Sequence, residues 1–255
     1  MKLVQLIPID VPKPITELTE AQIKELQTAL SRLGYPMGEG DDNGSDGLFG
    51  PRTRNAWAEF KTDVFQGNPD LIGLGSVKTL QKKLDETGDG VIHDFSTKEG
   101  TIKAIKWECK AKGIGLNTQI AYVLATTEWE TAQTFKPVRE AFWLNENWLR
   151  DNLPSKNYFP YYGRGFVQLT WKSNYSKYSQ ILGIDLVNNS NLALDNNIAL
   201  FILVHGFKTG VFTGRKITDY INNGVTDFVN ARRCINGTDK AYEIAGLANK
   251  YLATL

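Results

Sequence analysis

Two glutamates stand at the end of a predicted helix, Glu128 and Glu130, in the run Thr-Thr-Glu-Trp-Glu-Thr at 126–131. Successive helical residues are turned by about 100°, so these carboxylates point about 200° apart and cannot both face one cleft. Glu130 follows Val123 by two turns and lies at the border of the predicted apolar face. Partial burial favours a protonated carboxyl group, which suits a general acid. A solvated glutamate in a fraying last turn is the alternative.

The run Tyr-Tyr-Gly-Arg-Gly-Phe-Val-Gln-Leu-Thr-Trp-Lys-Ser-Asn-Tyr at 161–175 carries side chains that suit a sugar. Its alternation predicts a short strand over 166–170, with Gln168 and Thr170 on the same side. Aromatic faces cover the apolar side of a pyranose ring, while groups such as those of Gln168, Thr170 and Asn174 can bond its hydroxyls. An ordinary edge strand with a glycine turn is the alternative.

The bulk composition is that of a globular chain. Its 255 residues allow one large domain or two modest ones, and a hydrophobic content of 42% is enough for packed cores. Lys and Arg number 29 against 28 Asp and Glu, which gives a formal net charge of +1. No overall field therefore attracts nucleic acid or an anionic membrane, and any polymer must be recognised locally.

The cysteines and histidines argue against metal and cysteine chemistry. Cys109 and Cys234 lie far apart in the sequence, so reduced thiols are expected. Zinc needs three protein ligands, but neither His93 nor His205 has a second ligand at helical spacing. Cys109 before His205 is the order of a cysteine peptidase, yet Cys109 falls on the core face of a predicted helix. We expect no metal and no organic cofactor.

The segment Met1–Val11 is a poor signal peptide, because Pro8 and Asp10 interrupt its short apolar run. No segment approaches the roughly twenty apolar residues of a membrane span. The sequence therefore predicts synthesis in the cytosol without membrane insertion.

Helix signals predict a small three-helix bundle over residues 1–86. Thr19 can cap the first helix, Pro51 opens the second and Ser76 opens the third. The aperiodic region that follows contains Thr-Gly-Asp-Gly and predicts a linker over 87–97.

Residues 98–255 predict a larger domain, so that the whole chain is mainly α with a minor β element. A helix capped by Thr97 comes first, and the next, from Asn117 or Thr118, is apolar nearly all round, which places it at the centre of the domain. Periodicity predicts further helices over 146–153, 171–182, 197–208, 226–235 and 238–252.

The run at 161–175 resembles the signature of glycoside hydrolase family 19, a chitinase-like family whose fold bacteriophages also use in endolysins. The wider similarity runs from about Lys98 to the C-terminus and includes Leu182–Leu186 and Ile235–Gly237. The resemblance implies a lysozyme-like α domain that hydrolyses glycans.

The resemblance also implies the roles of several residues. The family places its catalytic acid in a His-Glu-Thr triplet, which Trp-Glu-Thr at 129–131 resembles, and compact members have a second Glu about ten residues later, where Glu140 stands. Glu130 would protonate the leaving oxygen and Glu140 would activate water across the gap of roughly 6.5–9.5 Å that inverting hydrolysis needs. Thr170 would help to hold that water. The predicted substrate-binding residues are Tyr161, Tyr162, Arg164, Gln168, Asn174 and Asn236.

The chain departs from the family pattern at positions that shape sugar subsites. Phe166 replaces Pro, Gly-Thr at 237–238 replaces Gly-Gly, and the arginine often found after Asn-Gly has no clear counterpart. A structural ion pair of Glu140, either near Arg139 or with Arg164, is the alternative to a catalytic role.

The N-terminal region, from about Leu18 to Leu84, resembles the common peptidoglycan-binding module of bacterial and phage wall hydrolases. The similarity is carried by Leu-Gly-Tyr at 33–35 and by Asp-Gly-Leu-Phe-Gly-Pro-Arg-Thr at 46–53, with a weaker echo at 74–76. The residues that it implies for wall binding are Asp46, Phe49, Arg52 and Thr53.

A calcium loop is the competing interpretation of this acidic region. Asp42, Asp46 and Gly47 fall at EF-hand positions, but Thr53 stands where the bidentate Glu belongs. The wall-binding interpretation is therefore favoured.

Together these resemblances predict a two-domain endolysin, a monomer that binds peptidoglycan through residues 1–86 and cleaves its β-1,4 glycan linkages, as a muramidase, with residues 98–255. It would be made in the host cytoplasm and reach the wall in the periplasm through another factor, such as a holin. A chitinase acting on N-acetylglucosamine polymers and a non-catalytic wall-binding protein are the alternatives.

Overall fold

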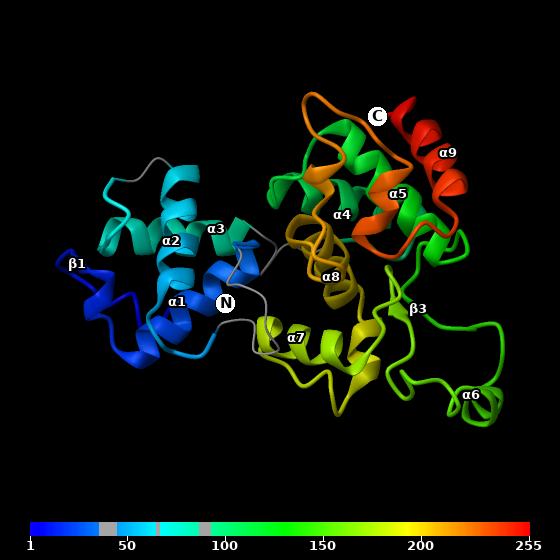
Figure 1. Cartoon of the computed structure of the whole chain (residues 1–255), viewed down its shortest axis with the longest axis horizontal. Helices are drawn as coiled ribbons and strands as arrows, with labels where there is room; N and C mark the ends of the chain where they lie inside the picture. Colours follow the sequence, from blue (N-terminus) through cyan, green and yellow to red (C-terminus); the bar gives the residue numbers. More distant parts are fainter. Residues whose placement is uncertain (36–44, 65–66, 87–92) are drawn as a thin grey trace. The chain divides into compact units, whose positions relative to one another are not determined.

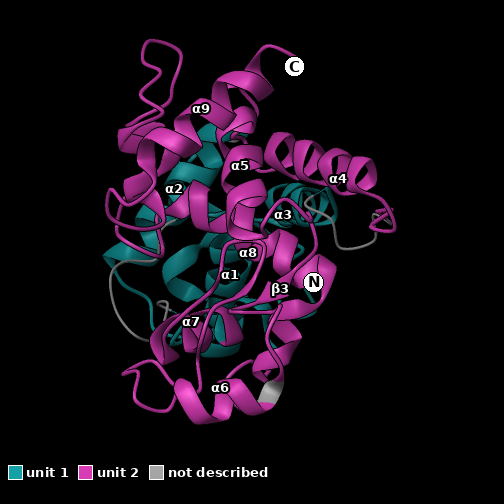
Figure 2. Cartoon of the chain, turned by 90° about the vertical axis from the view of Figure 1, so that its right-hand side faces the viewer, with its two compact units in different colours: residues 1–92, 180–184 teal, residues 93–179, 185–255 magenta. Residues whose placement is uncertain are grey.

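A computed structural model describes residues 1–35, 45–64, 67–86 and 93–255, which fall into two units (Figure 2). Unit 1 comprises residues 1–92 and 180–184, and unit 2 comprises 93–179 and 185–255. Part of the predicted linker, 87–92, and Asp42 of the calcium alternative lie outside the described residues.

Local capping signals set the ends of the helices of unit 1 (Figure 1). Thr19 and Gln22 form a reciprocal capping box, and Gly34 ends the first helix with a left-handed φ of +87°. Pro51 occupies the first turn of the second helix, as predicted, whereas the third begins two residues before Ser76. The elements are α1 Glu20–Leu33, α2 Pro51–Asp63, α3 Leu74–Glu86, the antiparallel pair β1 Lys13–Pro14 and β2 Leu71–Ile72, and a 3-10 turn Ile15–Glu17.

The core of unit 1 is formed by the apolar faces of α1, α2 and α3. Trp57 stacks on Phe60 at 5.2 Å between ring centroids, and both side chains are fully buried. Leu26 and Leu30 of α1 and Leu80 of α3 are buried in the same cluster. Burial of each such side chain contributes about 1.5–3 kcal/mol, which is enough to hold three short helices together.

Buried Gln27 of α1 fixes the loop that carries two of the predicted wall-binding residues. Its amide nitrogen donates to Asp46 Oδ1 at 2.9 Å and to Thr53 Oγ1 at 3.0 Å, and its oxygen accepts from Gly47 N at 2.8 Å. The bond from Leu48 N, and then that from Gln27, lower the pKa of Asp46. Thr53 is buried, so the structure gives it a structural role in place of the predicted wall contact.

Unit 2 is arranged around α5, Asn117–Glu130, in which every residue from Gln119 to Thr127 is buried. This helix contacts α4, α8 and α9, as Figure 1 shows. Tyr122 at its centre stacks on Phe228 and meets Phe207 edge to face. The helix that was predicted to be central is therefore the buried one, because it has almost no polar face to present to water.

The remaining elements of unit 2 surround this helix. They are α4 Lys98–Ala111, β3 Val138–Arg139, α6 Glu146–Asn152, β4 Arg164–Gly165, α7 Lys172–Leu182, a 3-10 turn Ser190–Leu194, α8 Asn196–Thr209, 3-10 turns Ile217–Asp219 and Asn230–Cys234, and α9 Ala241–Leu252. The last residues of α7 belong to unit 1 in the division given above. The fold is mainly α with minor β elements, as the sequence predicted.

Two local predictions are wrong. Residues 226–235 form only a 3-10 turn, Asn230–Cys234, and not an α-helix. The predicted strand over 166–170 is a tight turn, because the chain folds back after β4 so that Arg164 and Leu169 exchange both backbone hydrogen bonds. Gln168 has a φ of +53°, a left-handed conformation that no strand residue adopts.

Among the described residues, none of the helices combines the length and the apolar character that a membrane span requires.

We expect Gln27→Ala to lower the free energy of unfolding of unit 1 by about 2–3 kcal/mol, because it leaves buried partners without their hydrogen bonds. Chemical denaturation of the full chain measures this change. Thr28→Ala is the control, since the Thr28 hydroxyl is exposed and bonds only the carbonyl of Lys24. Equal stability of the two variants would contradict the role given to Gln27.

Candidate active site

Glu130 is the last residue of α5, and a buried arginine holds its carboxylate. Arg232 Nη1 donates to Glu130 Oε1 at 2.6 Å, and Arg232 Nε donates to the carbonyl of Asp239 at 3.0 Å. The side chains are 4% exposed for Arg232 and 15% exposed for Glu130. Within the described chain, Oε2 of Glu130 accepts no hydrogen bond, so this oxygen is available to a bound molecule.

The neighbouring glutamate is used differently. Glu128 accepts a hydrogen bond from the Tyr251 hydroxyl of α9, and Lys98 lies 4.0 Å from its other oxygen. This arrangement agrees with the angular separation expected on a helix. It leaves Glu130 as the carboxylate of this pair that lines the cleft described below.

Thr131 fixes the point at which α5 ends. Its buried hydroxyl donates to the carbonyl of Thr127 at 2.7 Å and accepts from Phe135 N at 3.1 Å. Ala132, Gln133 and Phe135 all have positive φ, so the helix cannot continue. The threonine that was singled out beside Glu130 therefore shapes the turn that presents this carboxylate.

Glu140 is the second predicted catalytic residue, and it follows β3. Its Oε1 accepts from the Tyr158 hydroxyl at 2.8 Å and its Oε2 from Gly163 N at 3.2 Å. Burial and the Glu140 carboxylate raise the pKa of Tyr158 to about 12, so this phenol is a hydrogen-bond donor at neutral pH. Tyr158 also lines the cleft, which places Glu140 directly behind one cleft residue.

A cleft of about 450 Å³ in unit 2 brings most of the predicted residues together. Its size and its mixture of aromatic, amide and hydroxyl groups suit a sugar ring. The residues that line it are Glu130, Tyr158, Val167, Gln168, Leu169, Thr170, Trp171, Asn174, Phe212, Thr213, Ile235, Asn236 and Gly237.

The predicted polar residues of the cleft are already partly bonded to the chain. Gln168 donates to the carbonyls of Val138 and Gly165, so its amide nitrogen ties the turn to β3. Asn174 donates to the carbonyl of Thr170, and the Thr170 hydroxyl donates to that of Gln168. These bonds orient the side chains and leave acceptor oxygens for a ligand.

Arg164 and Tyr162 do not line the cleft, which corrects their prediction as substrate-binding residues. The Arg164 guanidinium lies 3.8 Å from the Tyr162 ring centroid and donates to Asn191 Oδ1 and to the Tyr175 hydroxyl. Arg164 is only 4% exposed. An arginine with so many internal partners holds the loop together from within.

Tyr161 is half-buried against Tyr175, with 5.4 Å between ring centroids, and it is not among the residues that line the cleft. Its carbonyl accepts from Trp171 N at 3.0 Å. The backbone of Tyr161 thus helps to position Trp171, which does line the cleft.

The sequence analysis did not identify three residues of this site. Arg232 stands four residues before Asn236, on the opposite side from the position at which the family arginine was sought. Tyr158 and Trp171 meet edge to face at 5.6 Å, and Trp171 is 49% exposed. A buried arginine next to the exposed Arg233 and before buried Cys234 was the available signal.

Cysteine chemistry finds no support in the geometry. Cys109 and Cys234 are both free and buried, and burial raises the pKa of each thiol, that of Cys234 to about 12. His205 is buried and stacked on Phe201. Within the described ranges, no group of three His, Cys, Asp or Glu residues is arranged to hold a metal.

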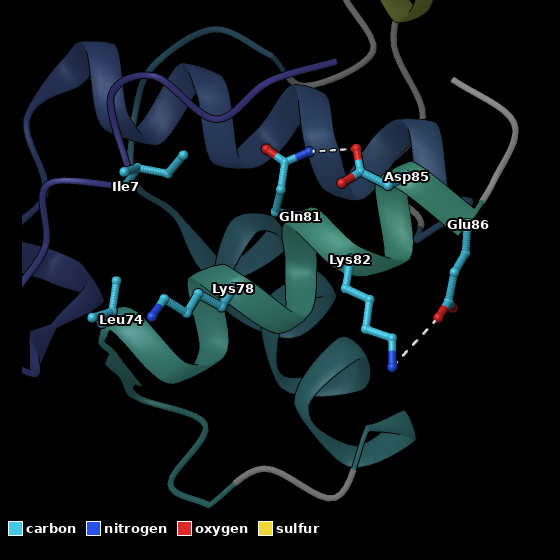
Figure 3. Close-up of a pocket in the computed structure, with 7 residues that line it drawn as sticks. All are labelled: Ile7, Leu74, Lys78, Gln81, Lys82, Asp85 and Glu86. Carbon is cyan, nitrogen blue, oxygen red and sulfur yellow. Dashed lines mark hydrogen bonds and ion pairs between the residues drawn. The ribbon is translucent and has the colours of Figure 1, made fainter. Parts of the chain in front are cut away.

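Unit 1 has a groove of its own, with a volume of about 490 Å³ (Figure 3). Ile7 and Leu74 form apolar borders, and Lys78, Gln81 and Lys82 project from the same face of α3. Gln81 bonds Asp85, and Lys82 lies 3.8 Å from Glu86. In contrast, the described residues give the Lys78 ammonium no hydrogen bond or ion pair.

Two of the four predicted wall-binding residues are exposed. Phe49 is half-buried against the core of unit 1, Thr53 is bonded to Gln27, and Asp46 and Arg52 reach solvent. None of them lines the groove of Figure 3.

A mainly α fold with a carboxylate at the wall of a sugar-sized cleft is the class of site seen in unit 2. Residues 143–212 match the family model Glyco_hydro_19, described as chitinase class I. This segment is therefore similar to glycoside hydrolase family 19. It includes Trp171 and Asn174, whereas Glu130 and Glu140 precede it.

Two curated relatives share a short stretch with this chain. An inactive chitinase-like protein 1 of Hevea brasiliensis is 46% identical over 41 residues, which is 16% of this chain and 13% of the relative. Chitinase 11 of Oryza sativa subsp. japonica is 50% identical over 42 residues, which is 16% of either chain. The matches thus span less than a fifth of these relatives.

A solved structure of a chitinase C mutant aligns with a TM-score of 0.36 and 19% identity, over 68% of this chain and 74% of that chain.

We expect Arg232→Met to lower the free energy of unfolding of unit 2 by about 2–3 kcal/mol, because it leaves the partly buried Glu130 carboxylate without its partner. Arg233→Met is the matched control, since its exposed side chain bonds only Asn230 at 3.3 Å. The control should change stability by less than about 0.5 kcal/mol. Denaturant unfolding followed by tryptophan fluorescence compares them, and equal losses would argue against a stabilising ion pair.

Proposed function

We propose that this protein hydrolyses β-1,4 linkages of bacterial peptidoglycan, with Glu130 as general acid and Glu140 as general base. The observation that carries the proposal is the position of Glu130. It ends a buried helix at the wall of a cleft whose other walls carry aromatic and amide groups. The family 19 match over the adjoining segment supports a glycan as the substrate class.

The proton transfers follow from the contacts of each carboxyl group. Arg232 occupies Oε1 of Glu130, so Oε2 carries the proton and delivers it to the leaving glycosidic oxygen. As the C–O bond breaks, Glu130 becomes a carboxylate, which the Arg232 guanidinium stabilises. A water molecule adds to the anomeric carbon and gives its proton to Glu140, and Thr170 is placed to orient this water.

The choice of peptidoglycan rests on the resemblance of unit 1 to wall-binding modules. In this proposal the chain is a monomeric endolysin of a phage with a Gram-negative host, made in the cytoplasm and active on the wall in the periplasm. Unit 1 holds the enzyme on its insoluble substrate, which raises the local concentration of the cleft near the glycan strands.

A chitinase is the second candidate, because the matched family model and chitinase 11 both have that description. Mass spectrometry of digests separates the two. New reducing-end N-acetylmuramic acid from sacculi indicates a muramidase, whereas release of N-acetylglucosamine oligomers from chitin, with sacculi left intact, indicates a chitinase. Cleavage of peptides alone would contradict both.

We expect Glu130→Gln to lower the rate of dye release from labelled sacculi by about 100- to 10,000-fold, the usual contribution of a general acid. Glu128→Gln is the matched control, since this carboxylate bonds Tyr251 and does not line the cleft. It should retain activity within about threefold. Lysis by Glu130→Gln at the wild-type rate would remove Glu130 from the mechanism.

For unit 1, we expect Lys78→Glu to weaken binding to sacculi by about 5- to 10-fold, because the stem peptides carry carboxylates that a glutamate would repel. Co-sedimentation measures this in full-length protein that also carries Glu130→Gln, so that the sacculi stay intact. Lys24→Glu on α1 is the control with equal charge change at another exposed lysine. Equal weakening by both would indicate nonspecific electrostatics and not a site in the groove.

A further inference from the structure

The turn that follows Glu140 displays an aromatic pair to solvent. Trp143 is 70% exposed, one of the most exposed large apolar side chains of the described chain. Phe142 meets it edge to face, with 5.3 Å between ring centroids and an interplanar angle of 76°. An indole left so far in water gains nothing for the stability of the fold, so its exposure calls for a function.

This turn is held rigidly. The guanidinium of Arg139 donates to the carbonyls of Glu140 at 3.1 Å, Ala141 at 2.9 Å and Leu144. Leu144 N in turn donates to the carbonyl of Ala141 at 2.9 Å. Ala141 has a φ of +50°, a left-handed conformation that a residue with a Cβ rarely adopts. Trp143 is therefore presented on a fixed scaffold, which lowers the entropy lost when a ligand binds.

The turn is continuous with the candidate active site. Three residues separate Trp143 from Glu140, so their Cα atoms lie within about 11 Å of each other. The Glu140 carboxylate bonds Tyr158, which lines the cleft. A polymer bound across the cleft continues beyond it, and the aromatic pair lies within reach of its next sugars.

The chemistry of the turn favours a glycan over other occupants. Two aromatic rings are far too small for a protein interface, which takes about 800 Å² from each partner. The formal net charge of +1 provides no general attraction to an anionic membrane. A rigid indole face does suit the apolar face of a pyranose, and the exposed Asn147 beside it can bond hydroxyl groups.

We propose that Trp143, supported by Phe142 and the Arg139 clamp, is an additional sugar-binding subsite that holds the glycan strand outside the cleft. The subsite rests on the proposed glycosidase function and deepens it. It makes the enzyme selective for long strands, because a short oligosaccharide fills the cleft without reaching Trp143.

The test compares polymer with short substrate in the full-length protein. We expect Trp143→Ala to raise KM for solubilised glycan strands about 5- to 20-fold, as loss of one stacking platform does, with kcat changed less than twofold. On a soluble β-1,4 tetrasaccharide its kcat/KM should equal that of the wild type. Trp143→Phe should restore most of the affinity for the polymer.

Tyr242→Ala is the matched control, since Tyr242 is 79% exposed on α9, away from the turn. It should leave both substrates unaffected. An unchanged KM of Trp143→Ala for the polymer would overturn the proposal, and so would an equal loss on both substrates, which indicates a structural effect. Trp143-dependent binding to phosphatidylglycerol vesicles with normal polymer KM would also overturn it, in favour of membrane docking.

The two proposals fail separately. If Glu130→Gln is inactive while Trp143→Ala degrades long strands normally, the subsite is wrong and the glycosidase stands. If Glu130→Gln is fully active, the glycosidase mechanism itself is wrong.

Discussion

The ion pair between Arg232 and Glu130 is the interaction on which the site depends. It joins the end of the most buried helix of unit 2 to a 3-10 turn about a hundred residues later in the chain, and both partners are largely shielded from water. A carboxylate at the end of a helix would otherwise turn to solvent, because the last turn frays. Arg232 fixes one oxygen and so aims the other, while Thr131 stops the helix at the right residue. The geometry of the candidate acid is thus set by side chains that do not touch the substrate.

The opposite wall of the cleft is built on a second arginine. Arg164 lies inside the loop at 161–175 and bonds carbonyl, hydroxyl and amide groups from separate parts of the chain. With these bonds made, the loop can take the left-handed conformations at Gln168 and Trp171 that place their side chains in the cleft. Glycine at 163 is required by the same packing, since a Cβ there would lie 2.7 Å from the Gln168 side-chain oxygen. The residues that make this stretch recognisable therefore serve its shape as much as its chemistry.

Most of the helices were predictable because local signals decide them. Thr19, Pro51 and Thr97 stand at the starts of helices where their chemistry predicts starts, and the all-round apolar α5 is the buried one. The predictions that failed depend on contacts distant in sequence. The alternation at 166–170 is that of a strand, but the fold-back onto Arg164 makes it a turn. Arg232 was missed for the same reason, since nothing near it in sequence shows that its partner is Glu130. Arg164 was assigned to the substrate because sequence shows the charge of an arginine but not its burial.

The central claim is that Glu130 donates a proton to the leaving oxygen while Glu140 delivers water to the opposite face of the sugar. Such a single displacement inverts the anomeric centre. Time-resolved proton NMR of the first minutes of digestion identifies the anomer before it equilibrates. Inversion predicts that the α-anomer appears first at the new reducing end. A β-anomer appearing first, or an anhydro sugar in place of a reducing end, would contradict the roles assigned to the two carboxylates.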